Sequence, residues 1–591
     1  MDVNRESFQK KTYFCNVSVC ETSYIQEHKD NNNMKRIILF YLLFLLVPCC
    51  ALAYDFIIDG IYYKIISEED RLCKIVSYHE EMDPAAPREV IFVPAKVMDE
   101  GKEYTVAIIG EYAFHDVNDL LSVVLPNTII EIKSYAFAGC RQMKSITVPS
   151  SVTNIMPSAF VGLDSLRYLA VDAGNKVYDS RKGCNAIIES ETNTLLFGCR
   201  STIIPDGVEV IASNAFWIIP EGGTEPFAID IPASVRVIGD CAFQAGKWLS
   251  GVTLHEGLEE IGGLAFYGTS IESVVIPASV KIISPSAFAD TKQLKSIKVK
   301  KGNEVYDSRK GCNAIIESAN DRLVQACATT KIPKGIKVIA QDAFEYVDVT
   351  DLAIPSSVVE IERGAFFGSG LKGPLVIPGN VKRIGESAFS CCYGVDELVV
   401  EEGIETIGNS AFSSCTGLRR AKLPASLKNL GSGLSYSMVF EGCRLLEKIE
   451  LPEENPNYYC YSNAVVEKST LTVVASTGLG HSQLHIGRQE YRPTRIASGV
   501  FRRLPYLTAV WLPETLEEIE PAAFFGCPSI EFIYCACKIP PLLGERNFGL
   551  IHQSNWNLPP RESVVIVVPA GSLDAYRSAP GWKEFKHIVE N

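Results

Sequence analysis

The amino-acid sequence predicts an α/β repeat solenoid, in which short parallel strands form a sheet on the concave face of a right-handed coil. Two observations carry this prediction: a dipeptide that returns at a fixed spacing, and a short strand pattern, closed by proline, within each repeat. Two β-hairpin insertions and a capping unit at each end complete the architecture expected for the 591 residues.

The dipeptide Ala-Phe sets the period of the repeat. It occurs twelve times, most often 22 or 23 residues apart, and two of the gaps are 56 residues long. A fixed period of this size indicates stacked units, each too small to bury its own apolar face. Because a large aromatic returns to the same slot, we expect the rings to stack into a continuous spine. The rings are Phe114, Phe137, Phe160, Phe216, Phe243, Phe266, Phe288, Phe344, Phe366, Phe389, Phe412 and Phe524, with Phe440 and Phe501 following valine in the same slot.

Each unit also contains a short strand. Residues 143–149 alternate apolar and polar side chains, which is typical of a half-buried strand. Pro149 ends the strand because proline has no N–H to donate. Ile132 and Phe137 are expected to point inward on the return path. Strands that repeat about every 23 residues and are joined by crossovers must run parallel.

Together these features resemble the BspA-like leucine-rich-repeat surface protein family, whose LRR_5 type repeats are about 23 residues long. The resemblance rests on the order proline, Ile-Gly, Ala-Phe, Gly-Cys, leucine and isoleucine, and it covers residues 54–591. Asp55–Tyr63 is similar to the family's N-terminal hairpin, and Val568–Phe585 to its C-terminal closing unit. The resemblance implies a leucine-rich-repeat solenoid. Such repeats place a buried Asn or Cys ladder where this chain has Cys140, Cys415, Cys443 and Cys527.

A thirteen-residue segment occurs twice without change. Residues 178–190 are identical to residues 306–318, and each copy lies inside one of the 56-residue gaps. Each copy continues through a polar turn into a second apolar segment, which predicts a β-hairpin in place of the usual return arm. A third, degraded copy is expected near residues 457–475. The identity fits a shared ligand site and fits a recent duplication equally well.

Residues 34–53 are predicted to be a signal peptide for export. A basic start at Met34 precedes an apolar run that is too short to span a bilayer, and small residues around Ala53 suit cleavage by signal peptidase. The chain is therefore expected to be secreted or held at the cell surface. Soluble export is favoured, and an outer-membrane lipid anchor at Cys49 or Cys50 stays open.

These signals divide the chain into five segments. The polar residues before Met34 match no targeting segment, so they are either a disordered leader or lie upstream of the true start. The repeat pattern then places a solenoid between two end units. The segments are residues 1–33 (doubtful extension), 34–53 (signal peptide), 54–105 (N-terminal β cap), 106–535 (leucine-rich-repeat solenoid) and 536–591 (C-terminal capping unit).

Composition and motifs argue against nucleic-acid binding and against catalysis. The 70 acidic residues outnumber the 56 basic ones, whereas a nucleic-acid binder needs clustered cations. No nucleophile, phosphate-loop or zinc-protease motif occurs, so no catalytic, cofactor-binding or metal residues and no cofactor are assigned. Most of the 19 cysteines are interpreted as buried fillers, although bridges at Cys391-Cys392 or Cys535-x-Cys537 stay open. His481 and His485 are interpreted as parts of a solvated loop.

Ligand binding is predicted on the strand face that points away from the core. The third and fifth positions of the Leu-x-x-Ile-x-Leu frame face outward, and parallel strands about 4.8 Å apart turn them into a flat platform. Such a platform suits a protein or a polymeric glycan better than a small molecule. The candidate binding residues on this face are Tyr168, Thr147, Thr253, Lys298, Arg420, Lys422 and Trp511, with Tyr168 and Trp511 as aromatic anchors.

The sequence therefore favours a non-enzymatic binding protein. The family resemblance implies adhesion to, or recognition of, host proteins, host cells or other bacteria. The alternative is a polysaccharide-binding module for glycan capture. An enzyme is the weakest hypothesis, because the two ends are too short and too similar to the repeat to contain a catalytic domain. The oligomeric state is not predicted.

Overall fold

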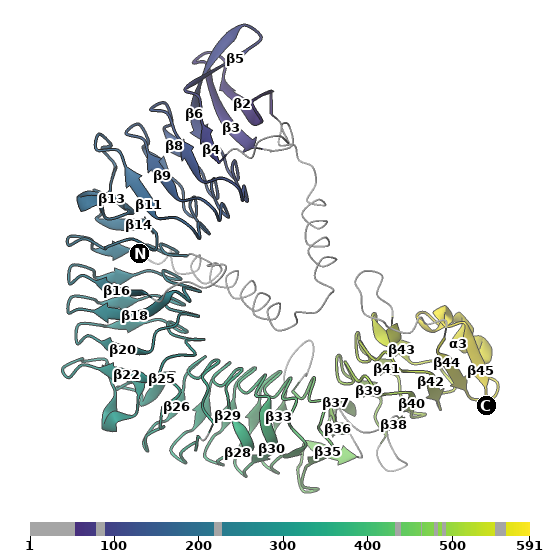
Figure 1. Ribbon diagram of the computed structural model, residues 1–591. Helices are drawn as coiled ribbons and strands as arrows, with labels where there is room; N and C mark the ends of the chain where they lie inside the picture. Colours follow the sequence, from purple (N-terminus) through teal and green to yellow (C-terminus); the bar gives the residue numbers. More distant parts are fainter. Residues whose placement is uncertain are drawn as a thin grey trace.

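The computed structural model shows a long series of coils stacked along an open arc (Figure 1). Each regular coil contributes one longer strand and one strand of two residues, connected by tight turns. Strands of successive coils pair in parallel, which confirms the predicted repeat solenoid. The structure describes residues 54–78, 89–217, 227–350, 352–431, 439–461, 464–477, 483–486, 492–549 and 563–591.

Some expectations concern residues outside these ranges. The N-terminal extension at 1–33, the signal peptide at 34–53 and His481 all lie there. The boundaries at residues 105 and 535 also stay predictions.

The longer strands form what we call the long ladder. Residues one repeat apart lie side by side in it, as Tyr168 does with Ser145 and Leu169 with Ile146. Because side chains alternate along a strand, Leu169 points into the core and Tyr168 points outward. The long ladder comprises β4 (Val90–Phe92), β7 (Ser122–Val124), β9 (Ser145–Val148), β11 (Tyr168–Val171), β16 (Phe227–Ile231), β18 (Leu249–Leu254), β20 (Ser273–Ile276), β22 (Ser296–Val299), β28 (Lys372–Ile377), β30 (Gly394–Val400), β32 (Arg420–Lys422), β34 (Lys448–Glu450), β38 (Gln483–His485), β40 (Ala509–Leu512), β42 (Phe532–Cys535), β44 (Val565–Val568) and β45 (His587–Glu590).

The two-residue strands form the short ladder. Ile132 pairs with Ile109 on one side and Ile155 on the other, and all three side chains are buried. This confirms the inward position predicted for Ile132. The short ladder comprises β8 (Glu131–Ile132), β10 (Asn154–Ile155), β15 (Val210–Ile211), β17 (Val237–Ile238), β19 (Glu260–Ile261), β21 (Ile282–Ile283), β26 (Val338–Ile339), β27 (Glu360–Ile361), β29 (Arg383–Ile384), β31 (Thr406–Ile407), β33 (Asn429–Leu430), β39 (Arg495–Ile496), β41 (Glu518–Ile519) and β43 (Leu542–Leu543).

Helix is scarce in the described residues, so the helical content is lower than the α/β class suggests. There, α3 (Leu573–Ser578) is the one α-helix. The return arms turn too tightly for a helix: Tyr135, directly before an Ala-Phe pair, has a φ of 57°. A left-handed residue interrupts an α-helix. Short 3-10 turns occur at η2 (Arg181–Gly183), η3 (Arg309–Gly311), η4 (Asn547–Gly549) and η5 (Trp582–Glu584).

Stacked phenylalanine rings run through the core, but not as one continuous spine. Phe114 stacks on Phe137 with ring centroids 5.3 Å apart, and Phe137 stacks on Phe160 at 5.6 Å. Phe160 then meets Phe197 of the first insertion edge-on, at an interplanar angle of 79°. The expectation of a continuous spine is therefore wrong. Separate stacks run through Phe216, Phe243, Phe266 and Phe288, through Phe344, Phe366, Phe389, Phe412 and Phe440, and through Phe501, Phe524 and Phe548.

The three insertions are internal walls of the solenoid, which we call walls 1, 2 and 3. Each is an antiparallel sheet of three strands, so the predicted hairpins are confirmed and each gains one strand. In wall 1, Ile187 packs into the core before the wall, and its neighbour Ile188 packs into the core after it. Wall 1 is β12 (Tyr178–Asp179), β13 (Ala186–Glu189) and β14 (Thr194–Gly198); wall 2 is β23 (Tyr306–Asp307), β24 (Ala314–Glu317) and β25 (Arg322–Ala326); wall 3 is β35 (Tyr458–Tyr461), β36 (Ala464–Glu467) and β37 (Thr472–Ser476).

The walls divide the main hydrophobic core of the described residues into four large clusters, which we call modules 1 to 4. Their buried residues extend over 56–199, 184–327, 312–475 and 459–588, and the overlaps are the walls. Each wall repeats the strand order of the N-terminal end, where three antiparallel strands lead into a parallel one. A wall thus closes one module and opens the next. The N-terminal strands are β1 (Phe56–Ile58), β2 (Ile61–Ser67), β3 (Leu72–Tyr78), β5 (Lys96–Asp99) and β6 (Lys102–Ile109).

Three carboxyl groups lie close together at the turns that connect modules 2 and 3. The backbone N–H of Asp290 donates to the carbonyl of Glu345, and the Ser286 hydroxyl donates to Asp342 at 2.7 Å. Burial raises the pKa of all three carboxyls, and Asp290 and Asp342 further raise that of Glu345. Lys292 and Lys247 act to lower the pKa of Asp290, and Arg363 acts to lower those of Asp342 and Glu345. The Glu362 carboxylate acts to raise the pKa of Asp342.

The stability of this junction is expected to fall as the pH rises. A carboxyl with a raised pKa binds its proton more tightly in the folded chain than in the unfolded one. Its contribution is therefore complete below the unfolded pKa and is lost as the pH rises through the folded pKa. Glu345→Gln should raise stability at pH 7 by about 1 kcal/mol and weaken the pH dependence. Urea unfolding between pH 4 and pH 8 measures both effects, and an unchanged pH slope in the variant would contradict this assignment.

Candidate ligand-binding face

The predicted binding residues all lie on the long ladder, but they form no single compact site. Tyr168 is 54% exposed, whereas Thr147 on the neighbouring strand is half-buried. Walls separate the ladder into sections, so the candidates are distributed over four modules. Thr147 and Tyr168 lie in module 1, Thr253 and Lys298 in module 2, Arg420 and Lys422 in module 3, and Trp511 in module 4.

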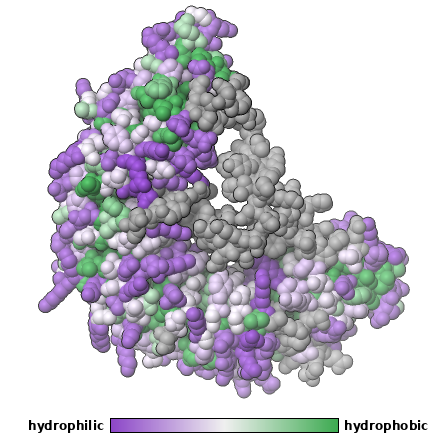
Figure 2. Space-filling view, in the orientation of Figure 1, coloured by the Kyte–Doolittle hydropathy of each residue, from purple (hydrophilic) through white to green (hydrophobic). Residues whose placement is uncertain are grey.

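Module 1 presents apolar side chains outward. Phe92 of the edge strand β4 is 71% exposed, and Val124 is its neighbour in the parallel register. Figure 2 shows hydrophobic surface gathered over the N-terminal coils on this side of the molecule. Sequence reasoning missed Phe92, although the apolar run Val90–Val93 is closed by a proline, Pro94, as the later strands are. The first section of the ladder therefore offers an apolar surface beside the hydroxyl groups of its neighbours.

Module 3 presents charge rather than apolar surface. The register places Arg420 between Glu397 and Lys448. Lys448 forms an ion pair with Glu450 at 2.7 Å and is the main cause that lowers the pKa of the Glu450 carboxyl. Arg420 and Lys422 are exposed, and neither forms an ion pair with another described residue. Arg420 and Lys422 therefore face outward beside the ion pair of Lys448 and Glu450.

A row of stacked aromatic rings crosses module 4. Trp511 stacks on His485 with centroids 4.2 Å apart, and on Tyr534 at 4.6 Å, because the three residues share one row of the parallel register. A neighbouring ring covers each face of Trp511, which is only half-exposed at its edge. A sugar ring packs against an open aromatic face. Trp511 therefore lacks the open geometry expected of an isolated anchor.

The interpretation of His485 as part of a solvated loop is wrong. His485 ends β38, which pairs in parallel with β40, and the Leu484 side chain is buried. A three-residue strand between glycine-rich segments is too short to stand out in the sequence. No group of three or more His, Cys, Asp or Glu side chains able to hold a metal ion occurs in the described ranges.

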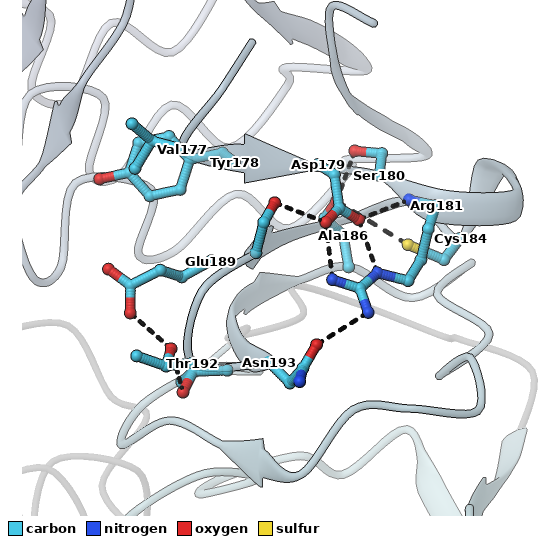
Figure 3. Close-up of polar contacts among 12 residues, drawn as sticks. Val177, Tyr178, Asp179, Ser180, Arg181, Cys184, Ala186, Glu189, Thr192 and Asn193 are labelled. Carbon is cyan, nitrogen blue, oxygen red and sulfur yellow. Dashed lines mark hydrogen bonds and ion pairs between the residues drawn. The ribbon is translucent and has the colours of Figure 1, made fainter.

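The repeated residues of wall 1 bind one another (Figure 3). Arg181 Nε and Nη2 donate to the two carboxylate oxygens of Asp179 at 2.8 and 2.7 Å, and Nη1 donates to Asn193 Oδ1 at 3.0 Å. The Ser190 hydroxyl also donates to Asp179. Burial acts to raise the pKa of Asp179, but the hydrogen bonds from Arg181 and Ser190 outweigh it and lower the pKa.

Wall 2 has the same network. Arg309 donates to both oxygens of Asp307 and to Asp321, and Ser318 donates to Asp307. The identical residues of the two walls thus have the same internal partners. The packing of each wall therefore gives these identical residues a structural role.

The four cysteines that the sequence assigns to the repeat's ladder, at positions 140, 415, 443 and 527, are all buried. Cys140 Sγ donates to the carbonyl of Phe114 at 2.8 Å, and burial raises the pKa of this thiol to about 12. Equivalent bonds run from Cys415 to Phe389 and from Cys527 to Phe501. No disulfide links the described cysteines, so the bridges left open at Cys391-Cys392 and Cys535-x-Cys537 are not formed.

Three solved structures illustrate what this chain is similar to. A leucine rich cell surface protein from Faecalibacterium prausnitzii A2-165 is 23% identical, with 67% of this chain and 94% of that chain covered, at a TM-score of 0.42. The pneumococcal vaccine antigen PcpA is 17% identical, with 91% and 98% covered, at 0.33. A leucine-rich repeat protein from Bacteroides ovatus is 20% identical, with 91% and 99% covered, at 0.32. A comparison with curated proteins finds no match.

The family comparison covers most of the solenoid. The model for the BspA type leucine rich repeat region matches in 6 copies, over residues 103–218, 225–320, 325–437 and 437–541. These ranges include long-ladder strands of all four modules. Within the described residues, no helix is long and apolar enough to cross a membrane. The chain belongs to the BspA-type leucine-rich-repeat family.

Proposed function

We propose that this protein is a secreted or cell-surface, non-enzymatic binding protein that recognises protein ligands, on host cells or on other bacteria, through the outward side chains of the long ladder. One observation carries the proposal. The ladder displays chemically different sections, with apolar residues such as Phe92 and Tyr168 in module 1 and exposed bases such as Arg420 in module 3. A long, flat and varied surface suits a macromolecule. Export rests on residues 34–53, and a lipid anchor at Cys49 or Cys50 stays open.

A protein ligand is favoured over a glycan. Glycan capture needs aromatic faces that are open to the sugar, and both faces of Trp511 are covered by neighbouring rings. Apolar and charged patches of the kind found in modules 1 and 3 are typical of protein interfaces.

The test is binding of the purified chain to immobilised extracellular-matrix and epithelial proteins. We expect Tyr168→Ala to weaken binding of a protein that module 1 captures by about tenfold. The double variant Arg420→Ala, Lys422→Ala should do the same for a protein that module 3 captures. Tyr506→Ala, which removes an exposed tyrosine outside the ladder strands, is the matched control. Capture of no protein at all would reject the proposal. Binding to a glycan array that Trp511→Ala abolishes would support the alternative.

A further inference from the structure

We propose that a groove between wall 1 and strand β16 binds an extended peptide, which adds to the free edge of β16 and places an apolar side chain between Ile203 and Phe227. The site lies at a break in the long ladder, on one edge of β16, and does not rest on the function proposed above. The argument uses the break in the ladder, the direction of the backbone groups of β16, and the composition of the groove.

The long ladder is interrupted at wall 1. Among the described strands, β11 ends one sheet, and β16 begins the next and pairs with β18 alone. The coil between them passes through residues 202–205, which form no strand. The N–H of Ile203 donates instead to Cys184 of the wall, at 3.1 Å. One place in the ladder is therefore left without a paired strand.

One edge of strand β16 faces this break in the ladder. The N–H of Phe227 donates to the carbonyl of Trp248, next to β18, at 2.8 Å. In a parallel sheet alternate residues direct both backbone groups to the same neighbour. Phe227, Ile229 and Ile231 therefore face β18, while Ala228 and Asp230 direct their N–H and C=O groups into the groove. Among the described residues, no segment across the groove bonds to them.

The break contains a cavity of about 620 Å³, lined on one side by residues 202–206 and on the other by residues 227–230. Ile203 is 76% exposed and Phe227 is 37% exposed, so two apolar side chains border the groove from opposite sides. A strand edge flanked by apolar pockets is the arrangement by which sheets accept an added peptide strand: main-chain bonds give affinity and the pockets give specificity. An unprotected edge of this kind is otherwise a liability.

The charges of the groove favour a peptide with a basic residue. Asp206 and Asp230 lie on its border against one lysine, Lys182, and His255 Nε2 lies 2.7 Å from Asp230. Wall 2 offers a natural comparison, because it repeats the sequence of wall 1 but has Lys331 in place of Ile203, Lys334 in place of Asp206 and Ala353 in place of Asp230. Wall 2 thus lacks the apolar residue and the two acids that border the groove at wall 1.

The probe is a displayed library of random linear nonapeptides, selected on the full-length chain. Selected peptides should carry an aliphatic or aromatic residue next to lysine or arginine. Ala228→Pro removes the backbone N–H that would donate to a peptide carbonyl. The bonds to β18 should stay, because they come from other residues and proline is tolerated on a strand edge. Ala228→Pro should weaken binding at least tenfold, as should Ile203→Lys, which copies wall 2 at a side chain that is already exposed. Methylation of alternate peptide nitrogens should abolish binding.

Lys331→Ala in wall 2 and Tyr168→Ala on the ladder are the controls, and both should leave peptide affinity unchanged. If Ala228→Pro lowers the melting temperature, Ile203→Lys and the methylated peptides decide the question. Selection of no peptide, or of peptides whose affinity is insensitive to Ile203→Lys and to N-methylation, would overturn the proposal. If Tyr168→Ala lost peptide binding, the peptide would bind on the ladder face around Tyr168 and not in the groove. That result would contradict the groove proposal but not the function proposed above.

Discussion

Phe389→Ala is expected to destabilise module 3 by about 3–5 kcal/mol, the usual cost of deleting a fully buried aromatic ring. The Phe389 ring is completely buried between Phe366 and Phe412, with centroids 4.8 and 5.4 Å away. Its carbonyl also accepts the bond from Cys415. The substitution therefore removes two stacking contacts and leaves a cavity in the middle of a stack.

The loss should stay within one module. A repeat protein couples each unit mainly to its neighbours, and the walls separate the core of residues 312–475 from the others. Hydrogen exchange followed by mass spectrometry should show faster exchange in module 3 and unchanged protection in module 1. Val376→Ala, on the exposed face of the same module, is the control and should change stability by less than about 0.5 kcal/mol. Equal loss of protection in all four modules would contradict the role assigned to the walls.

The fold could be predicted from the sequence because the spacing of the repeat fixes which residues of successive coils lie side by side. Ala-Phe returns to one slot, and Ile132 and Phe137 are buried as the pattern requires. The walls were recognised as hairpins, but their position inside the core was not. The signal was present: Ala186, Ile187 and Ile188 are consecutive apolar residues, which indicates a strand buried on both faces.

The candidate site was predictable only in part, for a physical reason. Alternation along a strand places Tyr168 outward, because that is a local property of the backbone. Whether an outward ring has an open face depends on residues one repeat away. Trp511 is covered by His485 and Tyr534, and the strand that brings His485 into register cannot be recognised from three residues.

Trp582→Ala is expected to destabilise module 4 by about 3–5 kcal/mol. Trp582 is fully buried, contacts Tyr576 edge-on at 5.3 Å, and donates its indole N–H to the carbonyl of Pro541 at 2.7 Å. Alanine would leave a cavity and also a buried carbonyl without its donor, which carries a cost of its own. Strands β44 and β45 should lose protection from exchange first. Tyr506→Ala, in the same module but 69% exposed, is the matched control.

Combining the two substitutions tests the walls directly. Phe389 and Trp582 belong to different core clusters, with wall 3 between them. Effects at independent sites add to within about 0.5 kcal/mol, whereas residues that share a core couple more strongly. The double variant should therefore lose the sum of the two free energies, in two separate unfolding transitions. A single transition, or a coupling well above that limit, would mean that wall 3 transmits strain between modules instead of confining it.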